Sequence, residues 1–152
     1  NKELADLIRS VFREFKIDRP GTVYFDPTTD DLYGLFRKNG SKYWIAEDSG
    51  VIIGGCGVYP TPGLPEGCAE LVKLYLLSTY RGKGIGRELI EKTFETAKKL
   101  GYRQLYLESL PELSKAIHIY ERAGFKKLDG PMGNSGHFGC DIWMIKDLTP
   151  DA

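Results

Sequence analysis

The chain has 152 residues, of which 41% are hydrophobic and 28% are charged, a composition typical of globular proteins. Its 21 basic residues balance its 21 acidic residues, so no overall field attracts nucleic acid or an anionic membrane surface. Three cysteines without Cys-x-x-Cys spacing and only two histidines favour a reducing, cytoplasmic setting and argue against a structural zinc site. The length predicts one domain over residues 1–152, and every apolar run is too short to span a bilayer.

Apolar periodicity and turn residues divide the chain into helices and strands. In chain order we predict helices at 3–16 and 31–37, strands at 42–47, 51–59 and 71–77, a long helix that ends at Gly101, a strand at 102–109, a helix at 113–123, and strands at 125–128 and 138–146. Asp48-Ser49-Gly50 predicts a hairpin turn, and Thr29 or Asp30 is the expected cap of the short second helix. The order predicts an α/β fold whose mixed central sheet carries helices on both faces.

The second predicted strand carries three glycines, Gly54, Gly55 and Gly57. Glycine inside a strand indicates a bulge or a close neighbour, and we expect one of these here. The same strand carries Cys56, and pairing with the following strand would bring it near Cys68. Free thiols remain the preferred interpretation, with a disulfide between these two cysteines as the alternative.

A glycine-rich loop, Arg81-Gly82-Lys83-Gly84-Ile85-Gly86, joins the apolar strand to the long helix. Glycine lets the backbone approach a ligand closely, and the first amides of a helix have no acceptor within it. The helix dipole and the side chains of Arg81, Lys83 and Arg87 add positive charge. The loop therefore predicts a phosphate or pyrophosphate site, and a tight turn with solvated basic residues is the alternative.

The loop is neither a Walker A motif nor a dinucleotide fingerprint, because no Ser or Thr follows its Gly-Lys and its glycines alternate. It matches Gln/Arg-x-x-Gly-x-Gly/Ala at Arg81, Gly84 and Gly86, and so resembles the acyl-CoA-binding motif of the GNAT superfamily of N-acetyltransferases. The segment 116–125 resembles the family's Ala-x-x-x-Tyr-x-x-x-Gly-Phe helix. Leu113 stands where many members carry an asparagine, a departure from the pattern.

This resemblance implies the GNAT fold, in which two strands of the sheet splay apart and admit the cofactor. The family usually has a further strand before its first helix, and we expect that strand to be either missing from this segment or lost from the domain. Acetyl-CoA is the implied co-substrate, and no metal is expected. The residues implied to bind it are Leu74 and Leu76, through their backbone to the pantetheine arm, and Arg81, Gly82, Lys83, Gly84, Ile85, Gly86 and Arg87, around the pyrophosphate. Simple core packing is the alternative for the two leucines.

Glu70 is the candidate general base. A lysine-like amine has a pKa near 10.4, so holding it neutral at pH 7 costs on the order of 4–5 kcal/mol, and a base removes this obstacle. By alternation Glu70 shares a strand face with Val72, Leu74 and Leu76, and apolar neighbours should raise its pKa. It also precedes Arg81 by 11 residues (81 − 70), where family members carry a catalytic glutamate. A solvated carboxylate or a structural ion pair is the alternative.

Tyr120 is the candidate general acid, since a phenol beside the sulfur can protonate the departing thiolate. The alternative is a tyrosine that only fills core space. Weaker candidates for the acceptor side are Tyr24, Tyr33, Tyr59 and His137, and core packing explains the three tyrosines equally well. Cys140 could form an acyl-enzyme, but direct transfer is the family norm, and a turn entering the last strand is the preferred interpretation of its segment.

The expected activity is acetyl transfer from acetyl-CoA to a primary amine of a small molecule or a protein, by direct attack. One alternative is a non-catalytic acyl-CoA sensor, which would need neither Glu70 nor Tyr120. Another is a nucleotide-phosphate binder, which would prefer ATP or GTP to CoA. Neither nucleic acid nor a membrane is an expected partner. The identity of the amine and the oligomeric state, including a homodimer, remain open at this level.

Overall fold

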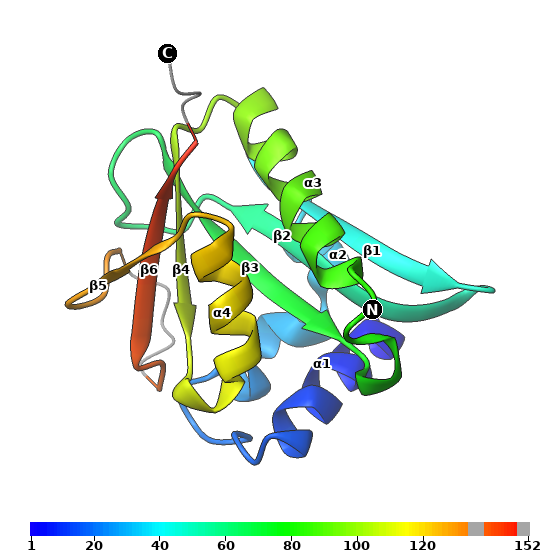
Figure 1. Cartoon of the computed structure of the whole chain (residues 1–152). Coiled ribbons are helices and arrows are strands. Elements are labelled where there is room, and N and C mark those ends of the chain that lie inside the picture. Colours follow the sequence, from blue (N-terminus) through cyan, green and yellow to red (C-terminus); the bar gives the residue numbers. More distant parts are fainter. Residues whose placement is uncertain (134–138, 149–152) are drawn as a thin grey trace.

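The computed structural model describes residues 1–133 and 139–148 (Figure 1). Its helices and strands are, in chain order, α1 (Lys2–Glu14), α2 (Leu32–Leu35), β1 (Lys42–Asp48), β2 (Val51–Tyr59), β3 (Cys68–Leu76), α3 (Ile85–Lys99), β4 (Gln104–Ser109), α4 (Ser114–Arg122), β5 (Lys126–Leu128) and β6 (Ile142–Asp147). Short 3₁₀ turns precede α2, α3 and α4. This is the predicted order of elements, and it confirms an α/β fold with a mixed sheet.

The six strands form one sheet in the order β1-β2-β3-β4-β6-β5. All neighbouring pairs are antiparallel except β3 and β4, which run parallel. Parallel neighbours need a crossover connection, and α3 supplies it. The predicted hairpin joins β1 to β2, with Ser49 and Gly50 both at positive φ, as a tight two-residue hairpin turn requires.

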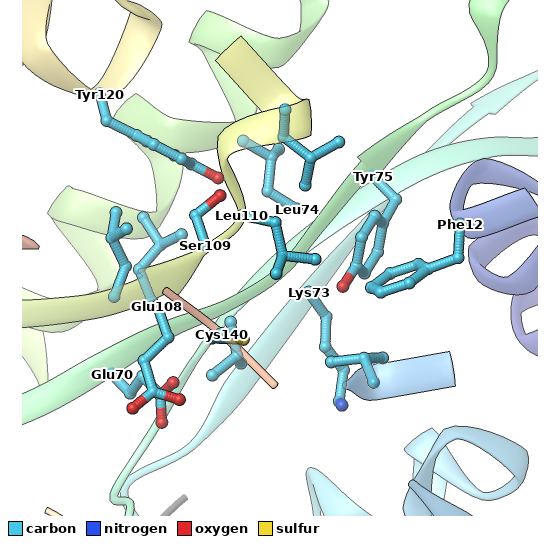
Figure 2. A pocket seen from close by; sticks show the side chains of 15 residues that line it. Phe12, Glu70, Lys73, Leu74, Tyr75, Glu108, Ser109, Leu110, Tyr120 and Cys140 are labelled. Atoms are coloured by element: carbon cyan, nitrogen blue, oxygen red, sulfur yellow. The ribbon is translucent and has the colours of Figure 1, made fainter. Parts of the chain in front are cut away.

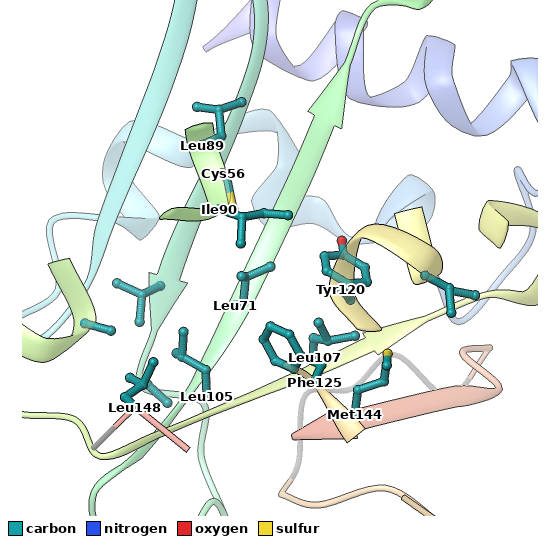
Figure 3. Close-up of a cluster of buried hydrophobic side chains, with 14 residues drawn as sticks. Cys56, Leu71, Leu89, Ile90, Leu105, Leu107, Tyr120, Phe125, Met144 and Leu148 are labelled. Carbon is teal, nitrogen blue, oxygen red and sulfur yellow. The ribbon is translucent and has the colours of Figure 1, made fainter. Parts of the chain in front are cut away.

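Two hydrophobic clusters cover the two faces of the sheet. The first lies between the sheet and the helices α3 and α4 (Figure 3), and its members include Cys56, Leu71, Leu89, Ile90, Leu105, Leu107, Ile117, Tyr120, Phe125 and Met144. The second joins α1 to the opposite face, and its members include Leu4, Leu7, Ile8, Val11, Phe12, Tyr75 and Leu110. Helices on both faces were predicted, because each amphipathic helix must bury its apolar stripe against the sheet.

The helix ends follow local chemistry, with one correction. Gly101, where the long helix was predicted to end, follows the C-cap Leu100 of α3 and takes a φ of +91°, the left-handed conformation in which many helices end. Helix α2 is capped by Asp31, whose carboxylate accepts a hydrogen bond from the Gly34 amide at 3.0 Å. The prediction of Thr29 or Asp30 as the cap was wrong, because both residues belong to the preceding 3₁₀ turn, which ends one residue before the helix cap.

A β-bulge interrupts β3 where the glycines of β2 lie against it. The register shifts between Gly55, opposite Tyr75, and Gly57, opposite Val72, so β3 holds one extra residue. A Cβ on Gly54 would lie 2.6 Å from the Tyr75 carbonyl oxygen, which explains the close approach predicted for these glycines. Lys73 lies in the bulge with a φ of +54°, a strained conformation for a residue with a side chain.

The bulge overturns one expectation about the faces of β3. Simple alternation placed Leu74 on the same face as Glu70. Instead, Leu74 packs with Leu71 in the cluster under α3 and α4, whereas Tyr75 packs with α1. The extra residue inverts the alternation beyond Val72, so the expectation for Leu74 was wrong.

The sheet opens between its two parallel strands. β3 and β4 are paired only from Cys68 to Glu70 and from Gln104 to Tyr106. Beyond these pairs β3 continues to Leu76 and β4 to Ser109, and the two arrows diverge in Figure 1. The splay implied by the family resemblance is therefore present in the sheet.

The last strand begins later than expected. β6 starts at Ile142, which pairs with Ser109, the last residue of β4. The prediction of a start at Phe138 was wrong for the described residues 139–141, because β4 offers no strand partner beyond Ser109. The prediction agrees with β6 from Ile142 onward, and Phe138 lies outside the described residues.

The three thiols are free, and the structure records Cys56 and Cys68 as buried. Burial raises the pKa of the Cys56 thiol to about 12, so this group stays protonated at neutral pH. The absence of a disulfide agrees with the preferred interpretation of the sequence. None of the helices in the described ranges is both long and apolar enough to cross a membrane.

Candidate active site

A cleft lies where β3 and β4 separate. About 590 Å³ of space without protein atoms lies in and around it, and this space includes open solvent. Its walls come from the two diverging strands, from α1 and α4, and from the segment before β6. The residues that line it are Phe12, Val23, Glu70, Leu71, Val72, Lys73, Leu74, Tyr75, Leu107, Glu108, Ser109, Leu110, Leu113, Tyr120 and Cys140.

The cleft connects the two faces of the sheet. Tyr120 and Leu74 belong to the cluster under α3 and α4, and Phe12 and Tyr75 belong to the cluster under α1. In Figure 2 Tyr120 and Leu74 lie on one side of the β3 ribbon, and Glu70 lies on the other side. A molecule that enters from the α3 face can therefore reach groups that open to the α1 face.

Glu70 lines the cleft and is held in place there by a hydrogen bond. Its side chain is only 4% exposed, and its Oε1 accepts a hydrogen bond of 2.5 Å from the Thr61 hydroxyl. A bond this short to a carboxylate is a strong, charge-assisted one, and it orients the carboxylate toward the cleft. The alternative of a strand-end carboxylate in solvent does not fit this burial.

Glu108 supplies a second carboxylate, which sequence reasoning missed. The Tyr106 hydroxyl donates a 2.7 Å hydrogen bond to its Oε2 and accepts one of 3.0 Å from the Met132 amide. Glu70 pairs with Tyr106 in the sheet, so Glu108, two residues further, lies on the same face as Glu70 (Figure 2). The available signal was a glutamate at the carboxyl end of an otherwise apolar strand.

Lys73 is the second residue that sequence reasoning missed. Its side chain lines the cleft and is 7% exposed. Burial lowers the pKa of its amine, and the nearby carboxylates of Asp26 and Glu70 oppose that effect. Nothing in the sequence distinguishes this lysine from a solvated strand residue, because its position depends on the bulge.

Replacing Lys73 with methionine is expected to raise the free energy of unfolding of the protein by about 1–3 kcal/mol at pH 7, because most of this residue is buried and burial disfavours its charged form. The lowered pKa means that the unfolded chain binds the extra proton. Wild-type stability should therefore rise with pH up to the free-lysine pKa, and the advantage of Lys73→Met should shrink over the same range. Chemical denaturation at several pH values measures both trends, and a less stable variant at pH 7 would contradict the argument.

Tyr120 lies on α4 with its hydroxyl directed into the cleft (Figure 2). Its ring packs edge-on against Phe125, with 5.8 Å between the ring centroids. Burial raises the pKa of Tyr120, and the nearby Cys56 adds to the shift. The phenol is therefore protonated at neutral pH and can donate a proton into the cleft.

The glycine-rich loop forms an open cradle at the start of α3. Gly82 and Gly84 have φ values of +77° and +83°, in the left-handed region that favours glycine. No heavy atom lies within 4 Å of a Cβ built on Gly82, Gly84 or Gly86, so the space above the loop is free in the described structure. The N-cap Gly84 has no side chain to satisfy the first amides of α3, which remain available to an anion.

The basic side chains near the loop are not equivalent. The Arg81 guanidinium forms two hydrogen bonds to Glu14, at 2.6 and 3.0 Å, and donates a third to the Leu76 carbonyl. This arrangement ties the loop to α1 and engages the Arg81 side chain in this structure. Lys83 lies over the Tyr80 ring at 5.6 Å, and Arg87 forms an exposed ion pair with Glu91.

The two leucines expected to pair with a pantetheine arm lie beside the opening in the sheet. Leu74 is in the part of β3 that β4 no longer pairs with. The Leu76 carbonyl already accepts a 3.0 Å hydrogen bond from Arg81 Nε, so its oxygen is engaged in this structure. Leu74 is thus the better placed of the two for an added backbone partner.

Among the described residues, the three tyrosines proposed for the acceptor side are not themselves among those that line the cleft. Tyr24 accepts a hydrogen bond from Arg13 and packs near Phe12. Tyr33 is 73% exposed on α2, and Tyr59 packs edge-on against Phe36. His137 lies outside the described residues.

Cys140 lines the cleft, but its thiol is poorly suited to nucleophilic attack. Burial raises the pKa of this thiol to about 12, and the carboxylates of Glu108 and Glu70 add to the shift. Among the described residues, no group of three or more histidines, cysteines or carboxylates could hold a metal ion. The titratable groups that line the cleft also include two carboxylates, a phenol and an amine.

A sheet opened between its parallel strands, beside a glycine-rich helix start, fits the acyl-CoA N-acetyltransferase class that the family resemblance implied. The chain belongs to the acetyltransferase (GNAT) family, whose sequence model matches residues 3–125. It is 35% identical over 149 residues to the Escherichia coli (strain K12) protein named Uncharacterized N-acetyltransferase YjgM, and the match covers 97% of this chain and 89% of that one.

Solved structures show the same fold. A GNAT-family acetyltransferase from Staphylococcus aureus Mu50 aligns with a TM-score of 0.81 at 22% identity, over 97% of this chain and 92% of that one. The PaiA N-acetyltransferase of Thermoplasma acidophilum, solved in complex with coenzyme A, aligns with a TM-score of 0.73 at 20% identity, over 96% and 91% of the two chains. The family prediction is confirmed, and the chain is an acyl-CoA N-acetyltransferase.

Proposed function

We propose that this chain, acting as one domain, transfers the acetyl group of acetyl-CoA directly to a primary amine, with Glu70 as the general base and Tyr120 as the general acid. The observation that carries the proposal is the cleft, which joins the face of the sheet under α3 to the buried carboxylate of Glu70. The free thiols fit the reducing, cytoplasmic setting expected from the sequence.

The cofactor would bind along the α3 face. Its pyrophosphate would accept hydrogen bonds from the first amides of α3 and from the loop 82–87, where left-handed glycines leave open space. Lys83 would add positive charge from a flexible side chain, whereas Arg81 would act by anchoring the loop to Glu14. The pantetheine arm would follow the unpaired edge of β3 at Leu74 and carry the thioester into the cleft.

The acceptor would approach from the α1 face, where Glu70 lies. An ordinary amine is almost fully protonated at neutral pH, and attack on the thioester carbonyl requires its lone pair. Glu70 would accept the proton as the new N–C bond forms. Its orientation by Thr61 supports this role, because a fixed base needs no reorganisation during attack. The high pKa of the Cys140 thiol favours direct transfer over an acyl-enzyme.

Tyr120 would protonate the departing sulfur. Its raised pKa keeps the proton on the phenol until a thiolate develops beside it. We expect Tyr120→Phe to lower kcat by about 10- to 100-fold, near the low end for general acids because a thiolate is already a stable leaving group. The affinity for acetyl-CoA and the thermal stability should change little. Steady-state kinetics test this, and a kcat near that of the wild type would assign Tyr120 to core packing alone.

Calorimetry and turnover together test the proposed function. Acetyl-CoA should bind more tightly than ATP, and CoA thiol should be released when a panel of primary amines is added. Preferential binding of ATP would favour the nucleotide-phosphate alternative. Tight acetyl-CoA binding without turnover of any amine would favour the sensor.

A further inference from the structure

Lys73 lines the cleft, and its amine has no direct partner among the residues that the structure describes. No hydrogen bond or ion pair joins its Nζ to any residue in the described ranges, although the side chain is 7% exposed. Two carboxylates act on it through space, those of Asp26 and Glu70. Asp26 accepts two hydrogen bonds from Thr28, and Glu70 accepts one from Thr61. The fold thus buries a lysine and gives both neighbouring carboxylates other partners.

Packing does not account for an ammonium group at this position. A methionine of similar length would fill the same space and avoid the cost of removing a charge from water. The strained backbone of the bulge places Lys73 in the cleft, and strain of this kind is typical of ligand sites. The pyrophosphate of the cofactor belongs at the start of α3, so a different anion is needed for Lys73.

The charged groups of the cleft are arranged as a dipole. In Figure 2 the carboxylates of Glu70 and Glu108 lie together at one end, the Lys73 amine lies at the other, and Cys140 lies between them. An acceptor with a single positive charge suits the carboxylate end alone. An acceptor that also carries a negative charge would satisfy both ends. A second positive charge on the acceptor would be repelled by Lys73.

We propose that Lys73 binds a carboxylate of the acceptor, so that the preferred substrates are small amines that carry a carboxylate close to the reacting nitrogen, amino acids being the simplest of this class. The inference rests on the proposed function, because it assigns the acceptor of the same cleft. The amine would lie beside Glu70 and the carboxylate beside Lys73. The bound carboxylate would supply the partner that Lys73 lacks in the ligand-free protein.

Matched acceptors test this assignment. For several amino acids, kcat/KM is measured for the amino acid, for its carboxamide and for the amine that remains after decarboxylation. Each value is divided by the fraction of the acceptor whose amine is neutral at the assay pH. A charge-assisted hydrogen bond predicts that the wild type prefers the carboxylate form by about 10- to 100-fold. Lys73→Met should abolish most of this preference through KM and leave the amide and the plain amine nearly unchanged. The matched control Lys127→Met, at an exposed position on β5, should keep the wild-type preference.

The outcomes separate the two proposals. Equal or faster turnover of amines without a carboxylate, including polyamines, would overturn the role of Lys73 and leave acetyl transfer intact. An unchanged preference in Lys73→Met would also overturn it. Acetylation of Lys73 itself, detected by peptide mass spectrometry, would make this residue an acceptor and contradict its role as an anchor. Turnover of none of the amines would reject the proposed function, and this inference with it.

Discussion

Replacing Glu70 with glutamine is expected to lower kcat by about 10²- to 10⁴-fold, the usual contribution of a positioned general base. Glutamine keeps the size of the side chain and can still accept a hydrogen bond from Thr61, so the wall of the cleft should persist. Affinity for acetyl-CoA should be unchanged, because the cofactor is expected on the opposite face. Assays of CoA release measure kcat, and calorimetry measures the affinity for acetyl-CoA, so the two expectations are tested separately.

Two further variants and the pH dependence of Glu70→Gln serve as controls. Glu95→Gln, at an exposed position on α3, should be neutral, whereas Glu108→Gln tests whether the other carboxylate of the cleft is the base. Activity of Glu70→Gln should recover as the pH rises toward the pKa of the acceptor, because neutral amine then needs no base. An unchanged kcat for Glu70→Gln, with a large loss for Glu108→Gln, would move the base from β3 to β4.

Replacing Gly86 with glutamate is expected to have opposite effects on cofactor binding and on stability. Like charges about 4 Å apart near a protein surface repel by roughly 4 kcal/mol, so acetyl-CoA affinity should fall by at least about 100-fold after screening. The same change should stabilise the fold by about 1–2 kcal/mol, since it removes a helical glycine and places a carboxylate in the first turn of α3. Gly86 is outside the positive-φ region and has open space above it, so neither strain nor a clash is expected.

The neutral variant Gly86→Gln isolates the charge from the added bulk. It should share part of the gain in stability and lose much less affinity for acetyl-CoA. Acetyl-pantetheine, which lacks the pyrophosphate, should bind all three proteins similarly. If Gly86→Glu kept acetyl-CoA affinity within about threefold of the wild type, far below the expected repulsion, the pyrophosphate could not lie at the start of α3.

Much of the fold was accessible from local patterns. The amphipathic helices, the Asp48-Ser49-Gly50 turn and the left-handed end at Gly101 each depend on residues close together in the chain. The glycine-rich loop is also local, since three glycines and the following helix define it. The family resemblance added the splay of the sheet, which the pairing of β3 with β4 confirms. Short-range physics and motif spacing therefore suffice for the architecture and the cofactor loop.

The acceptor side of the cleft depends on contacts between distant segments. The bulge at Lys73 arises where β3 meets the glycines of β2, and it inverts the strand alternation that sequence reasoning assumed. Glu108 joins Glu70 only because β3 and β4, separated by α3, pair in a particular register. Arg81, expected beside the pyrophosphate, forms an ion pair with Glu14 of α1 that its own segment does not predict. Register and long-range partners decide which side chains share a cavity, and no local pattern encodes either of them.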